Sequence, residues 1–341
     1  MNELKELAKL NGFTQNQLAR SADIEYTTLL SMAKTPVSHW NQRYKDSIAN
    51  TLDMTMADFE NSMSGHFMSP FVKWVGGKRQ LLPELVKRMP KDGYNKYYEP
   101  FVGGGALLLR LSPQNAVIND SNTELINAWK SVRDNLDRLS ELLLHHENED
   151  TKEYYLDLRS TDRDGRITKM TSIERGARFI YMNKAGFNGL WRENSHGQNN
   201  VPYGSHKRLN LVPESLTSVS EYLNRSNIKI MNTDYRKAVL GAQTGDFVYF
   251  DPPYIPVNQT SSFTNYTKDN FGLVQHEQLR DTALELASKG VMVMLSNADV
   301  PLIKDLYEDK IFKIHHVQAN RSINSNGSKR GKVGEVIITT Y

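Results

Sequence analysis

The stretch Phe247–Phe250 is an apolar run, Phe-Val-Tyr-Phe, that is followed at once by Asp251-Pro252-Pro253-Tyr254. β-branched and aromatic residues without a polar break are typical of a buried strand. The two prolines lack a backbone N–H and have a fixed φ, so the strand cannot continue through them. The sequence therefore predicts a carboxylate, an unpaired carbonyl and an aromatic ring, all held at the end of a sheet strand.

This combination suits the binding of a flat ring that carries an amino group. Asp251, together with a carbonyl of Asp251 or Pro252, can accept both hydrogens of an exocyclic amine. Tyr254 can stack on the face of such a ring. The alternative is purely structural: a strand that ends in a proline turn, with Asp251 as a helix cap. The tetrapeptide alone leaves both interpretations open.

Composition narrows the class of protein. The chain has 341 residues, 39% hydrophobic and 24% charged, which is ordinary for a water-soluble globular protein with room for two domains. It has no cysteine, which excludes disulfides and thiolate metal sites. Its nine histidines lack metal-ligand spacing, so no metal is expected. Without a membrane-length apolar run or a signal-like N-terminus, we expect a cytoplasmic protein with no membrane partner.

Residues 1–60 are predicted to form a small all-α domain. Leucines near the N-terminus have helical spacing, Thr14 is a candidate N-cap for a second helix, and a third helix is expected from Tyr26. The pattern resembles the helix-turn-helix of Cro and the phage repressors, whose second helix lies in the major groove of DNA. Few cations lie on the third helix, Lys34 being the clearest, so a helical bundle without a DNA role is the alternative.

Beyond a polar linker at 61–67, strands and helices alternate, which is typical of an α/β domain. One long helix is expected from about Glu124 to Leu144. The expected strands lie at 97–101, 115–120, 228–231, 247–250, 291–295, 311–317 and 334–340. Residues 145–225 are more polar and contain scattered helical pieces. We therefore expect one α/β domain made of residues 68–144 and 226–341, with an insert at 145–225.

A second motif, Glu99-Pro100-Phe101-Val102-Gly103-Gly104-Gly105, lies between a predicted strand and a predicted helix. Glycines at such a place let a ligand approach the backbone and leave helix N–H groups free. The spacing differs from the G-x-G-x-x-G of pyrophosphate binders. Asp120 ends the next predicted strand, where an acid can accept from both hydroxyls of a ribose. Helix capping is the alternative role for Asp120.

A third motif precedes both of these, at residues 70–79. It contains a tryptophan, two glycines and three cations. Trp74 could pack on a cofactor, and Lys78 could meet a carboxylate. The alternative is the start of a helix with a solvated basic end.

These motifs together resemble the Dam-type, or alpha-group, DNA adenine-N6 methyltransferases, in which the glycine motif precedes the D-P-P-Y motif. The resemblance covers about residues 68–341. It rests on motifs in the family's order: 71–78, 99–105, 119–120, 188–192, 200–204, 251–254 and 321–327. It implies a Rossmann-like, seven-stranded methyltransferase domain at 68–144 and 226–341, with a helical target-recognition domain at 145–225. The implied reaction is methyl transfer to N6 of adenine in duplex DNA, with the target base flipped out.

The resemblance implies S-adenosylmethionine as the methyl donor, with no metal. The residues expected to line the donor pocket are Trp74, Lys78, Phe101, Gly103 and Gly105. Asp120 would hold the ribose, Asp234 would accept from the adenine amine of the donor, and Tyr235 would pack beside that ring. Asp251, Pro252, Pro253 and Tyr254 would form the catalytic motif, with Asp251 between the donor and the target base.

The resemblance also implies a DNA-reading surface. Phe187 and Asn188 would lie near the intercalating position, and the segment from Leu190 to Arg192 would contact bases. The cation-rich loop at 319–332 is expected to bind phosphates. The predicted DNA contacts are Lys73, Phe187, Asn188, Leu190, Trp191, Arg192, Asn194, Pro202, His206, Lys207, Arg321, Asn324, Asn326, Lys329 and Arg330. A polar loop packed on its own domain is the alternative for 183–194.

One departure from the family concerns the target sequence. Members that modify GATC often follow the Pro-Tyr-Gly turn with Arg-Tyr-Lys, whereas this chain has Ser205-His206-Lys207. The change removes an arginine that could contact guanine with two hydrogen bonds. His206, Lys207 or Arg208 could replace it, and GATC or a related short site remains the expected target.

Two other functional classes fit parts of the sequence. One is a transcriptional regulator, in which residues 1–60 recognise an operator and the larger domain only senses the cofactor. The other is an RNA adenine-N6 methyltransferase. The expected partner is double-stranded DNA, and a cognate restriction endonuclease is a further candidate. The chain is expected to be a monomer or a weak dimer.

Overall fold

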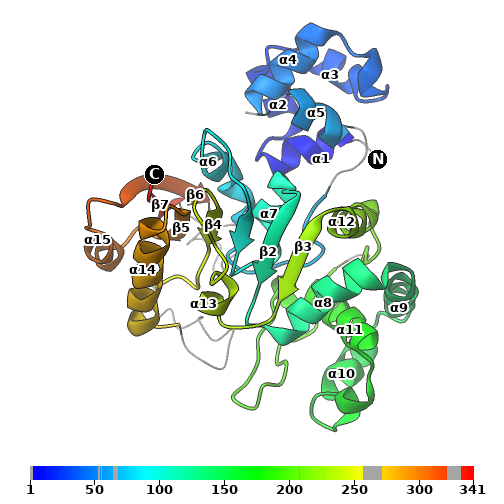
Figure 1. Ribbon diagram of the computed structural model, residues 1–341. Helices are drawn as coiled ribbons and strands as arrows, with labels where there is room; N and C mark the ends of the chain where they lie inside the picture. Colours follow the sequence, from blue (N-terminus) through cyan, green and yellow to red (C-terminus); the bar gives the residue numbers. More distant parts are fainter. Residues whose placement is uncertain are drawn as a thin grey trace. The chain divides into compact units, whose positions relative to one another are not determined.

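The structure is a computed structural model that describes residues 3–52, 54, 56–63, 68–206, 208–255, 271–320 and 332–341. The chain divides into two compact units. The first contains Met1–Ser69 and Lys78–Met89, and the second contains Pro70–Gly77 and Pro90–Tyr341. The first unit is helical, and the second contains the sheet (Figure 1).

The first unit confirms the all-α character expected of residues 1–60. Its elements are α1 (Glu3–Leu10), α2 (Gln15–Ser21), α3 (Tyr26–Met32), η1 (Val37–His39), α4 (Gln42–Thr51), α5 (Met56–Met63), η2 (Lys78–Gln80) and α6 (Leu82–Val86). Leu4, Leu18, Leu29, Ile48 and Phe59 are fully buried in its apolar core. Helix α5 ends at Met63, so the predicted linker at 61–67 overlaps the end of this helix.

Helices α2 and α3 begin where the sequence predicts. The Gln17 backbone N–H donates to Thr14 Oγ1 at 3.2 Å, and the Thr14 N–H donates to Gln17 Oε1 at 2.8 Å. This reciprocal pair satisfies two backbone donors that a helix start otherwise leaves free. The turn between the helices includes Asp23 at a φ of 53°. Contact of α3 with DNA stays a prediction.

The second unit contains one seven-stranded sheet in the order β3-β2-β1-β4-β5-β7-β6. The strands are β1 (Tyr97–Glu99), β2 (Asn115–Asn119), β3 (Asn227–Met231), β4 (Phe247–Phe250), β5 (Met292–Ala298), β6 (Lys313–Asn320) and β7 (Lys332–Thr339). Each lies at a predicted strand. The strands β1 to β5 pair in parallel, and β7 runs antiparallel to both of its neighbours. The expected seven-stranded α/β domain is confirmed.

The order of the strands reverses between β1 and β4. From β1 the chain builds outward to β2 and β3, then returns to place β4 on the other side of β1. The register pairs Tyr97 with Phe247 and Tyr98 with Val248. Where neighbouring parallel strands send their connections in opposite directions, a crevice opens outside their carboxyl ends. The loops after β1 and β4 therefore meet at one place.

Helices cover this sheet and extend beyond one edge of it (Figure 1). They are α7 (Ala106–Leu111), α8 (Thr123–Asp134), α9 (Leu136–Asn148), α10 (Lys152–Ser160), η3 (Arg166–Lys169), α11 (Ser172–Ala185), η4 (Phe187–Gly189), α12 (Glu214–Arg225), α13 (Tyr235–Ala238), α14 (Leu273–Ser288) and α15 (Pro301–Leu306). Helices α8 to α11 gather in a helical region beside β3, whereas α14 packs on β5. Among the described residues, no helix is both long enough and apolar enough to span a bilayer.

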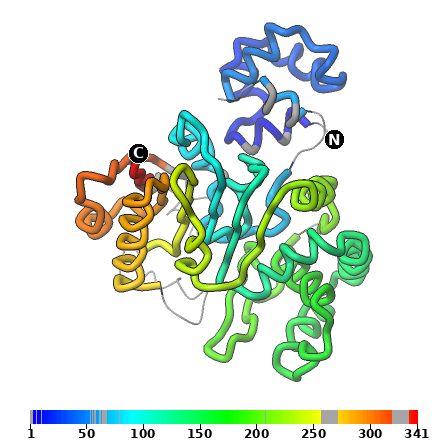
Figure 2. The backbone as a smooth tube through the Cα atoms, viewed as in Figure 1, coloured from blue at the N-terminus to red at the C-terminus, as the bar shows by residue number. Residues whose placement is uncertain are grey.

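The single helix expected over residues 124–144 is wrong, because the chain forms α8 and α9 instead. The break is at Asn135, which has a φ of −145° and a ψ of 42°. Asparagine competes with the helix through its own side chain and so favours helix ends. The break lets α8 pack on α11, α12 and β3 while α9 packs on another part of α11 (Figure 2). The predicted boundary after residue 144 falls inside α9, and we propose that the insert begins at Leu136.

Gly105 offers a test of how tightly the glycine loop is packed. It has a φ of +69°, and a Cβ there would lie 2.7 Å from the buried Trp129 ring. Gly105→Ala is expected to cost about 1–2 kcal/mol for the left-handed backbone and about 1–3 kcal/mol for overpacking. Gly93→Ala is the matched control, because Gly93 has a φ of +80° with no atom within 4 Å of its Cβ position.

Denaturant unfolding of the two variants measures the difference. Gly105→Ala should lose more stability than Gly93→Ala by the overpacking cost alone. Equal losses in the two variants would contradict a loop closed over Trp129.

Candidate active site

The glycine loop is anchored at its start by the buried Glu99. This carboxylate is 3% exposed and accepts from the Tyr97 hydroxyl at 2.8 Å and from the Leu108 N–H at 3.1 Å. Leu108 lies in the first turn of α7, where backbone donors lack helical partners. Glu99 therefore joins the end of β1 to the start of α7 and fixes both ends of the loop between them.

Within the loop, Gly103 is enclosed on three sides. Its N–H donates to Asp120 Oδ2 at 3.1 Å, and its carbonyl accepts from Trp129 Nε1 at 3.0 Å. A Cβ on Gly103 would lie 2.6 Å from Cδ1 of Trp74. The loop thus presents bare backbone between two indoles and a carboxylate. The structure brings Trp74, Gly103, Gly105 and Asp120 together, as the sequence predicts for a ligand pocket.

Asp120 keeps room for further hydrogen bonds. Its Oδ1 accepts from the Asn122 N–H at 2.9 Å, in addition to the Gly103 contact at Oδ2. A carboxylate has about four acceptor positions, so capacity for two ribose hydroxyls remains. Burial raises the pKa of Asp120 to about 6, against the lowering effect of the Asn122 and Gly103 N–H donors. Its charge is therefore sensitive to pH near neutrality.

A buried amide that sequence reasoning left without a role, Asn119, joins the loops after β1 and β3. Its Nδ2 donates to the carbonyls of Pro100 and Thr233, each at 3.0 Å, and its Oδ1 accepts from the Thr233 N–H at 2.9 Å. Asn119 is 1% exposed. This contact holds the segment Thr233-Asp234-Tyr235 beside the glycine loop.

Asp234 and Tyr235 begin α13 at the edge of this crevice. Asp234 accepts from the Arg236 backbone N–H at 3.0 Å and pairs with the Arg236 guanidinium at 2.8 Å. Hydrogen bonds from Arg236 lower the pKa of Asp234, which keeps it ionised. The Tyr235 ring lies 5.2 Å from that of Phe101 and 6.2 Å from that of Phe271. Phe271 was missed, because no motif marks it in the sequence.

The D-P-P-Y motif leaves the end of β4 and is anchored on β5 and β7. Asp251 Oδ1 accepts from Ser296 Oγ of β5 at 2.8 Å. Tyr254 is partly buried, and its hydroxyl donates to Glu335 Oε2 of β7 at 2.9 Å. Burial, followed by the charges of Asp251 and Glu335, raises the pKa of Tyr254 well above its usual value. Ser296 and Glu335 were also missed, since neither residue belongs to a motif.

The side chains at the crevice fit a cationic nucleoside such as S-adenosylmethionine. Bare glycine backbone, aromatic rings and the carboxylates of Asp120 and Asp234 offer contacts to a ribose, a purine and a positive charge.

Lys78 is 6% exposed and belongs to the first unit, so its predicted contact with the donor stays a prediction. Among the residues that the structure describes, no group of three or more metal-binding side chains comes together, and the expectation of no metal stays a prediction.

The predicted DNA contacts Lys73 and Phe187 belong to one connected surface. The Lys73 backbone N–H donates to Asn183 Oδ1 at 2.8 Å, and Asn183 Nδ2 donates to the carbonyls of Lys73 and Gly189 at 2.7 and 3.0 Å. A Cβ on Gly189 would lie 2.6 Å from Cβ of Lys73. Asn183 is fully buried. The sequence included Asn183 only in the predicted DNA-reading segment 183–194, whereas its observed contacts hold Lys73 against the turn Phe187–Gly189.

This turn presents an exposed aromatic ring. Phe187 is 45% exposed, and its N–H donates to the Pro202 carbonyl at 2.9 Å. Asn188, which follows it, is exposed and has a φ of 55°. Leu190 is half-buried beside them. An exposed ring on a braced turn has the shape expected of a wedge that enters a base stack.

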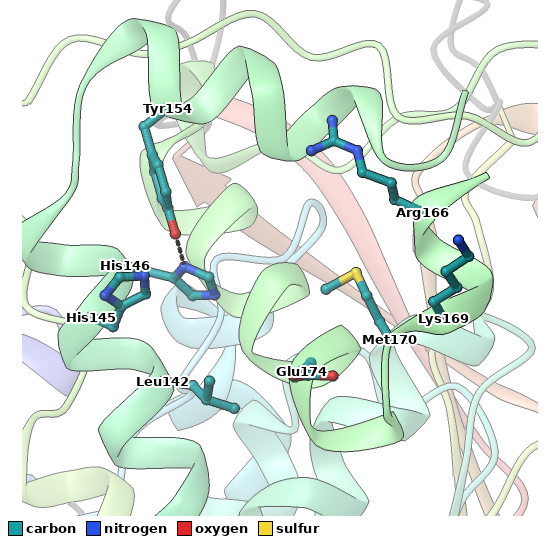
Figure 3. A pocket seen from close by; sticks show the side chains of 8 residues that line it. All are labelled: Leu142, His145, His146, Tyr154, Arg166, Lys169, Met170 and Glu174. Carbon is teal, nitrogen blue, oxygen red and sulfur yellow. Dashed lines mark hydrogen bonds between the residues drawn. The ribbon is translucent and has the colours of Figure 1, made fainter. Parts of the chain in front are cut away.

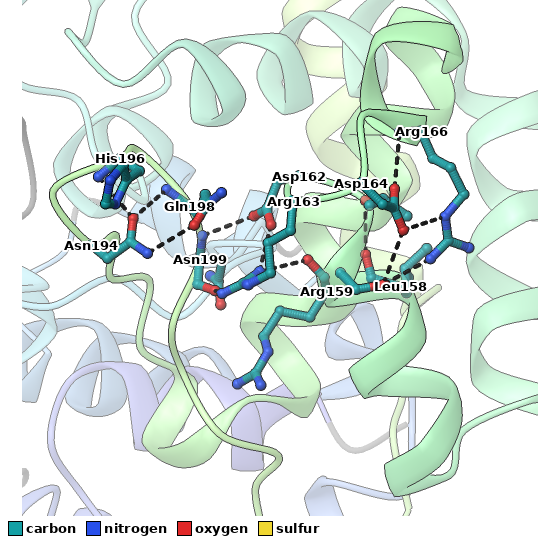
Figure 4. Close-up of polar contacts among 12 residues, drawn as sticks. Leu158, Arg159, Asp162, Arg163, Asp164, Arg166, Asn194, His196, Gln198 and Asn199 are labelled. Carbon is teal, nitrogen blue, oxygen red and sulfur yellow. Dashed lines mark hydrogen bonds and ion pairs between the residues drawn. The ribbon is translucent and has the colours of Figure 1, made fainter.

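Residues 192–200 form a short hairpin, called the recognition hairpin below. The Asn200 N–H donates to the Arg192 carbonyl at 3.0 Å, and Arg192 Nε donates to Asn200 Oδ1 at 2.6 Å. Beyond α10, Asp162 accepts from the Asn199 N–H at 2.8 Å and Arg163 donates to the Asn199 carbonyl at 2.5 Å (Figure 4). The exposed Arg192 is therefore carried on a braced segment.

Trp191 corrects one prediction. It is 3% exposed, its ring lies 4.3 Å from that of Phe179, and its Nε1 donates to Glu193 Oε1 at 2.9 Å. The indole is a packing residue and does not face a DNA groove, because its apolar surface is used inside the helical region.

Two further predicted contacts are engaged within the protein. Asn194 Oδ1 accepts from the N–H groups of His196 and Gln198 and so shapes the tip of the recognition hairpin (Figure 4). His206 Nε2 lies 2.6 Å from Asp150 Oδ2. The expected contacts at Lys207 and at Arg321, Asn324, Asn326, Lys329 and Arg330 lie outside the described residues.

A hollow of about 390 Å³ lies elsewhere in the helical region, between α9, α10 and α11 (Figure 3). Its lining includes His146, whose Nδ1 lies 2.7 Å from the Tyr154 hydroxyl. Burial lowers the pKa of His146 to about 4, so the ring is neutral at pH 7. None of the predicted site residues lines this hollow.

The chain is similar to known DNA methyltransferases. The family model described as D12 class N6 adenine-specific DNA methyltransferase matches residues 74–323. The Type II methyltransferase M1.LlaDCHI of Lactococcus lactis subsp. cremoris is 54% identical over 275 residues, which cover 80% of this chain and 96% of that protein. A DNA adenine methylase of Haemophilus influenzae is 34% identical over 272 residues, 79% of this chain and 92% of that protein.

A class I S-adenosylmethionine-dependent methyltransferase structure from Listeria monocytogenes covers 99% of this chain and 88% of its own, at 12% identity and a TM-score of 0.34. That score is too low to carry an argument. Residues 1–73 lie outside the family match, and both relatives are matched over nearly their whole length.

The raised pKa of Asp120 predicts how donor binding depends on pH. Ribose hydroxyls donate best to the ionised carboxylate, and this carboxylate takes up a proton as the pH falls through about 6, well above its usual 3.8. Affinity for S-adenosylmethionine should therefore weaken as the pH falls from 7 to 5, and it should level off above about 7. Equilibrium dialysis with labelled donor measures this.

Asp120→Asn is the control for this titration. It should bind the donor more weakly and lack the step near pH 6, because its side chain does not titrate. An equal step in Asp120→Asn would assign the pH dependence to another group.

Proposed function

Because the chain belongs to the D12 class of N6 adenine-specific DNA methyltransferases, we propose that the crevice between the β1 and β4 loops is its active site. The enzyme transfers a methyl group from S-adenosylmethionine to N6 of adenine in DNA. The observation that carries the proposed location is the pairing of β1 with β4, which brings the glycine loop to the D-P-P-Y motif. The family and its relatives are DNA enzymes, so the regulator and RNA alternatives are set aside.

Several residues of the crevice would hold the donor. The glycine backbone at Gly103 and Gly105 and the Phe101 ring line the pocket, with Trp74 beside them. Asp120 would accept from the ribose hydroxyls, and Asp234 would accept from the purine amine, with Tyr235 against the ring. When bound, S-adenosylmethionine supplies a methyl group on a sulfonium, which is an excellent leaving group. No metal is required for that transfer.

Asp251 would make the target amine reactive. The lone pair of an adenine amine is delocalised into the ring, so the amine is a poor nucleophile. If Asp251 and a Pro252-side carbonyl accept its two hydrogens, a pyramidal nitrogen with a localised lone pair is favoured. After transfer the nitrogen is cationic, and the carboxylate stabilises its proton. Positioning and electrostatics then supply most of the rate.

The target adenine is hidden in duplex DNA, so it must rotate out of the helix. Tyr254 would stack on the extruded base, a contact worth about 1–3 kcal/mol by analogy with single-strand binders. Phe187 and Asn188, exposed on their braced turn, would enter the space left in the duplex. This turn is anchored to Lys73, which itself precedes the Trp74 of the donor pocket.

We assign GATC, or a closely related site, as the target. Lys73, Leu190, Arg192 and Pro202 would contact its bases or backbone. Pro202 and Arg192 are exposed on neighbouring segments of the same surface. His206 is already paired with Asp150. We therefore propose that Lys207 or Arg208 replaces the arginine that the family pattern has in this segment.

Two further partners are proposed. The name of the Lactococcus relative, a Type II methyltransferase, favours a cognate restriction endonuclease for the same site. Residues 1–69 of the first unit, which lie outside the family match, would make a second contact with DNA through α3, on which Thr27 and Ser31 are exposed.

The role of Asp251 is tested by Asp251→Ala. This variant should fold and bind S-adenosylmethionine but lose about a hundredfold or more of its turnover, because the amine loses a charged acceptor. Incorporation of labelled methyl groups into unmethylated DNA measures turnover. The control is Asp157→Ala, an exposed acid on α10 that pairs with Arg166 and should leave activity unchanged. Full activity of Asp251→Ala would refute the assignment.

The target sequence is tested by mapping methylated adenines in mixed genomic DNA after incubation with the enzyme and the donor. Methylation confined to the adenine of GATC is the expected result. Methylation at another short site would reject the proposed target and leave the reaction unchanged.

A further inference from the structure

The catalytic carboxylate has a buried partner outside its own motif. The register pairs Phe250 of β4 with Leu295 of β5, so the residues that follow, Asp251 and Ser296, also lie side by side. Ser296 Oγ is 2.8 Å from Asp251 Oδ1, and Ser296 is fully buried. A hydroxyl in the middle of an apolar strand is costly unless it is hydrogen-bonded. Its position opposite the acid indicates a function.

The direction of the hydrogen bonds follows from the chemistry of the groups. An ionised carboxylate only accepts, so the single hydroxyl hydrogen of Ser296 points to Asp251. The Tyr249 hydroxyl lies 2.9 Å from the same Ser296 oxygen and must therefore donate to it. Burial, followed by the charge of Asp251, raises the pKa of Tyr249 well above its usual value, so the phenol keeps its proton. A directed chain runs from Tyr249 through Ser296 to Asp251.

We propose that Ser296 is a positioning residue for methyl transfer, and that Tyr249 orients it. The proposal rests on the proposed role of Asp251. Asp251 follows Phe250, the last residue of β4. The hydrogen bond that Ser296 donates holds the Asp251 carboxylate in one orientation toward the crevice. A catalytic group that is already oriented does not have to rearrange before the reaction. The hydrogen bond from Ser296 therefore increases the rate of methyl transfer.

Removal of the Ser296 hydroxyl should lower the rate of methyl transfer and change the affinities for S-adenosylmethionine and DNA only slightly. Loss of the Ser296 hydroxyl leaves the hydrogen bonds of Lys73 with Asn183 and of Asp120 with Gly103 in place, because Ser296 takes no part in them. The loss instead frees the Asp251 carboxylate to turn. A purely structural Ser296 would lower stability and donor affinity together, so the two roles are separable.

The experiment uses the full chain and an unmethylated duplex that carries one target adenine identified by mapping. Ser296→Ala should slow single-turnover methyl transfer about ten- to hundredfold, the range for loss of a hydrogen bond to a charged group. The dissociation constants for S-adenosylmethionine and for DNA should stay within about twofold. Ser296→Thr, which keeps the hydroxyl on a strand-favouring residue, should restore most of the rate.

Tyr249→Phe tests the second link without touching Ser296. It should slow methyl transfer about three- to tenfold, since Ser296 still donates to Asp251 but loses the Tyr249 hydroxyl that donates to it and fixes its orientation. Tyr222→Phe is the matched control. Tyr222 is fully buried and donates to the Pro113 carbonyl at 3.0 Å, outside the chain from Tyr249 to Asp251, so the rate should not change. Thermal denaturation of each variant accounts for any loss of folded protein.

A methyl-transfer rate of Ser296→Ala within about twofold of wild type would overturn the proposal. If Ser296→Ala does not fold, Tyr249→Phe decides, and a rate equal to that of Tyr222→Phe overturns it. Asp251→Ala separates this inference from the proposed function. An inactive Asp251→Ala beside a fully active Ser296→Ala rejects only the positioning role, whereas a fully active Asp251→Ala rejects the function assigned to the carboxylate itself.

Discussion

The parallel pairing of β1 with β4 is the constraint on which the rest of the site depends. Because the strand order reverses there, the loop after β1 and the loop after β4 leave the sheet side by side, although β4 follows β1 by more than a hundred residues. The glycine loop then lies beside the D-P-P-Y motif, although a long stretch of chain separates the two motifs in sequence. A crevice of this kind is a property of backbone topology, and side chains only line it.

Buried amides hold the loops of this topology in place. Asn119 ties the loop after β1 to the loop after β3, and Asn183 ties Lys73 to the turn at Gly189. Each uses both ends of its amide on backbone groups, which would otherwise be buried without partners. The proposed donor pocket and the proposed DNA-reading surface are thereby linked through the consecutive residues Lys73 and Trp74. Trp74 packs on Gly103.

The motifs predicted much of the site because their chemistry is local. The glycines before α7 and the prolines after β4 each favour a particular backbone conformation, and the acid after β2 adds a carboxylate. All three features lie where the sequence predicts them. Trp191 shows the limit of such reasoning. Its position in a DNA-reading motif suggested groove contact, yet its ring packs on Phe179, because burial depends on a helix that the motif does not contain.

The sequence by itself determined the strands, the two loops that carry the chemistry and the helical character of the N-terminus, because periodicity, prolines and glycines act on neighbouring residues. Only the tertiary structure decided which partners those loops acquire. Ser296 beside Asp251, Glu335 beside Tyr254 and the break at Asn135 arise from strand register and helix packing. Register joins residues far apart in the chain, and a single serine in an apolar strand does not reveal the strand that will lie beside it.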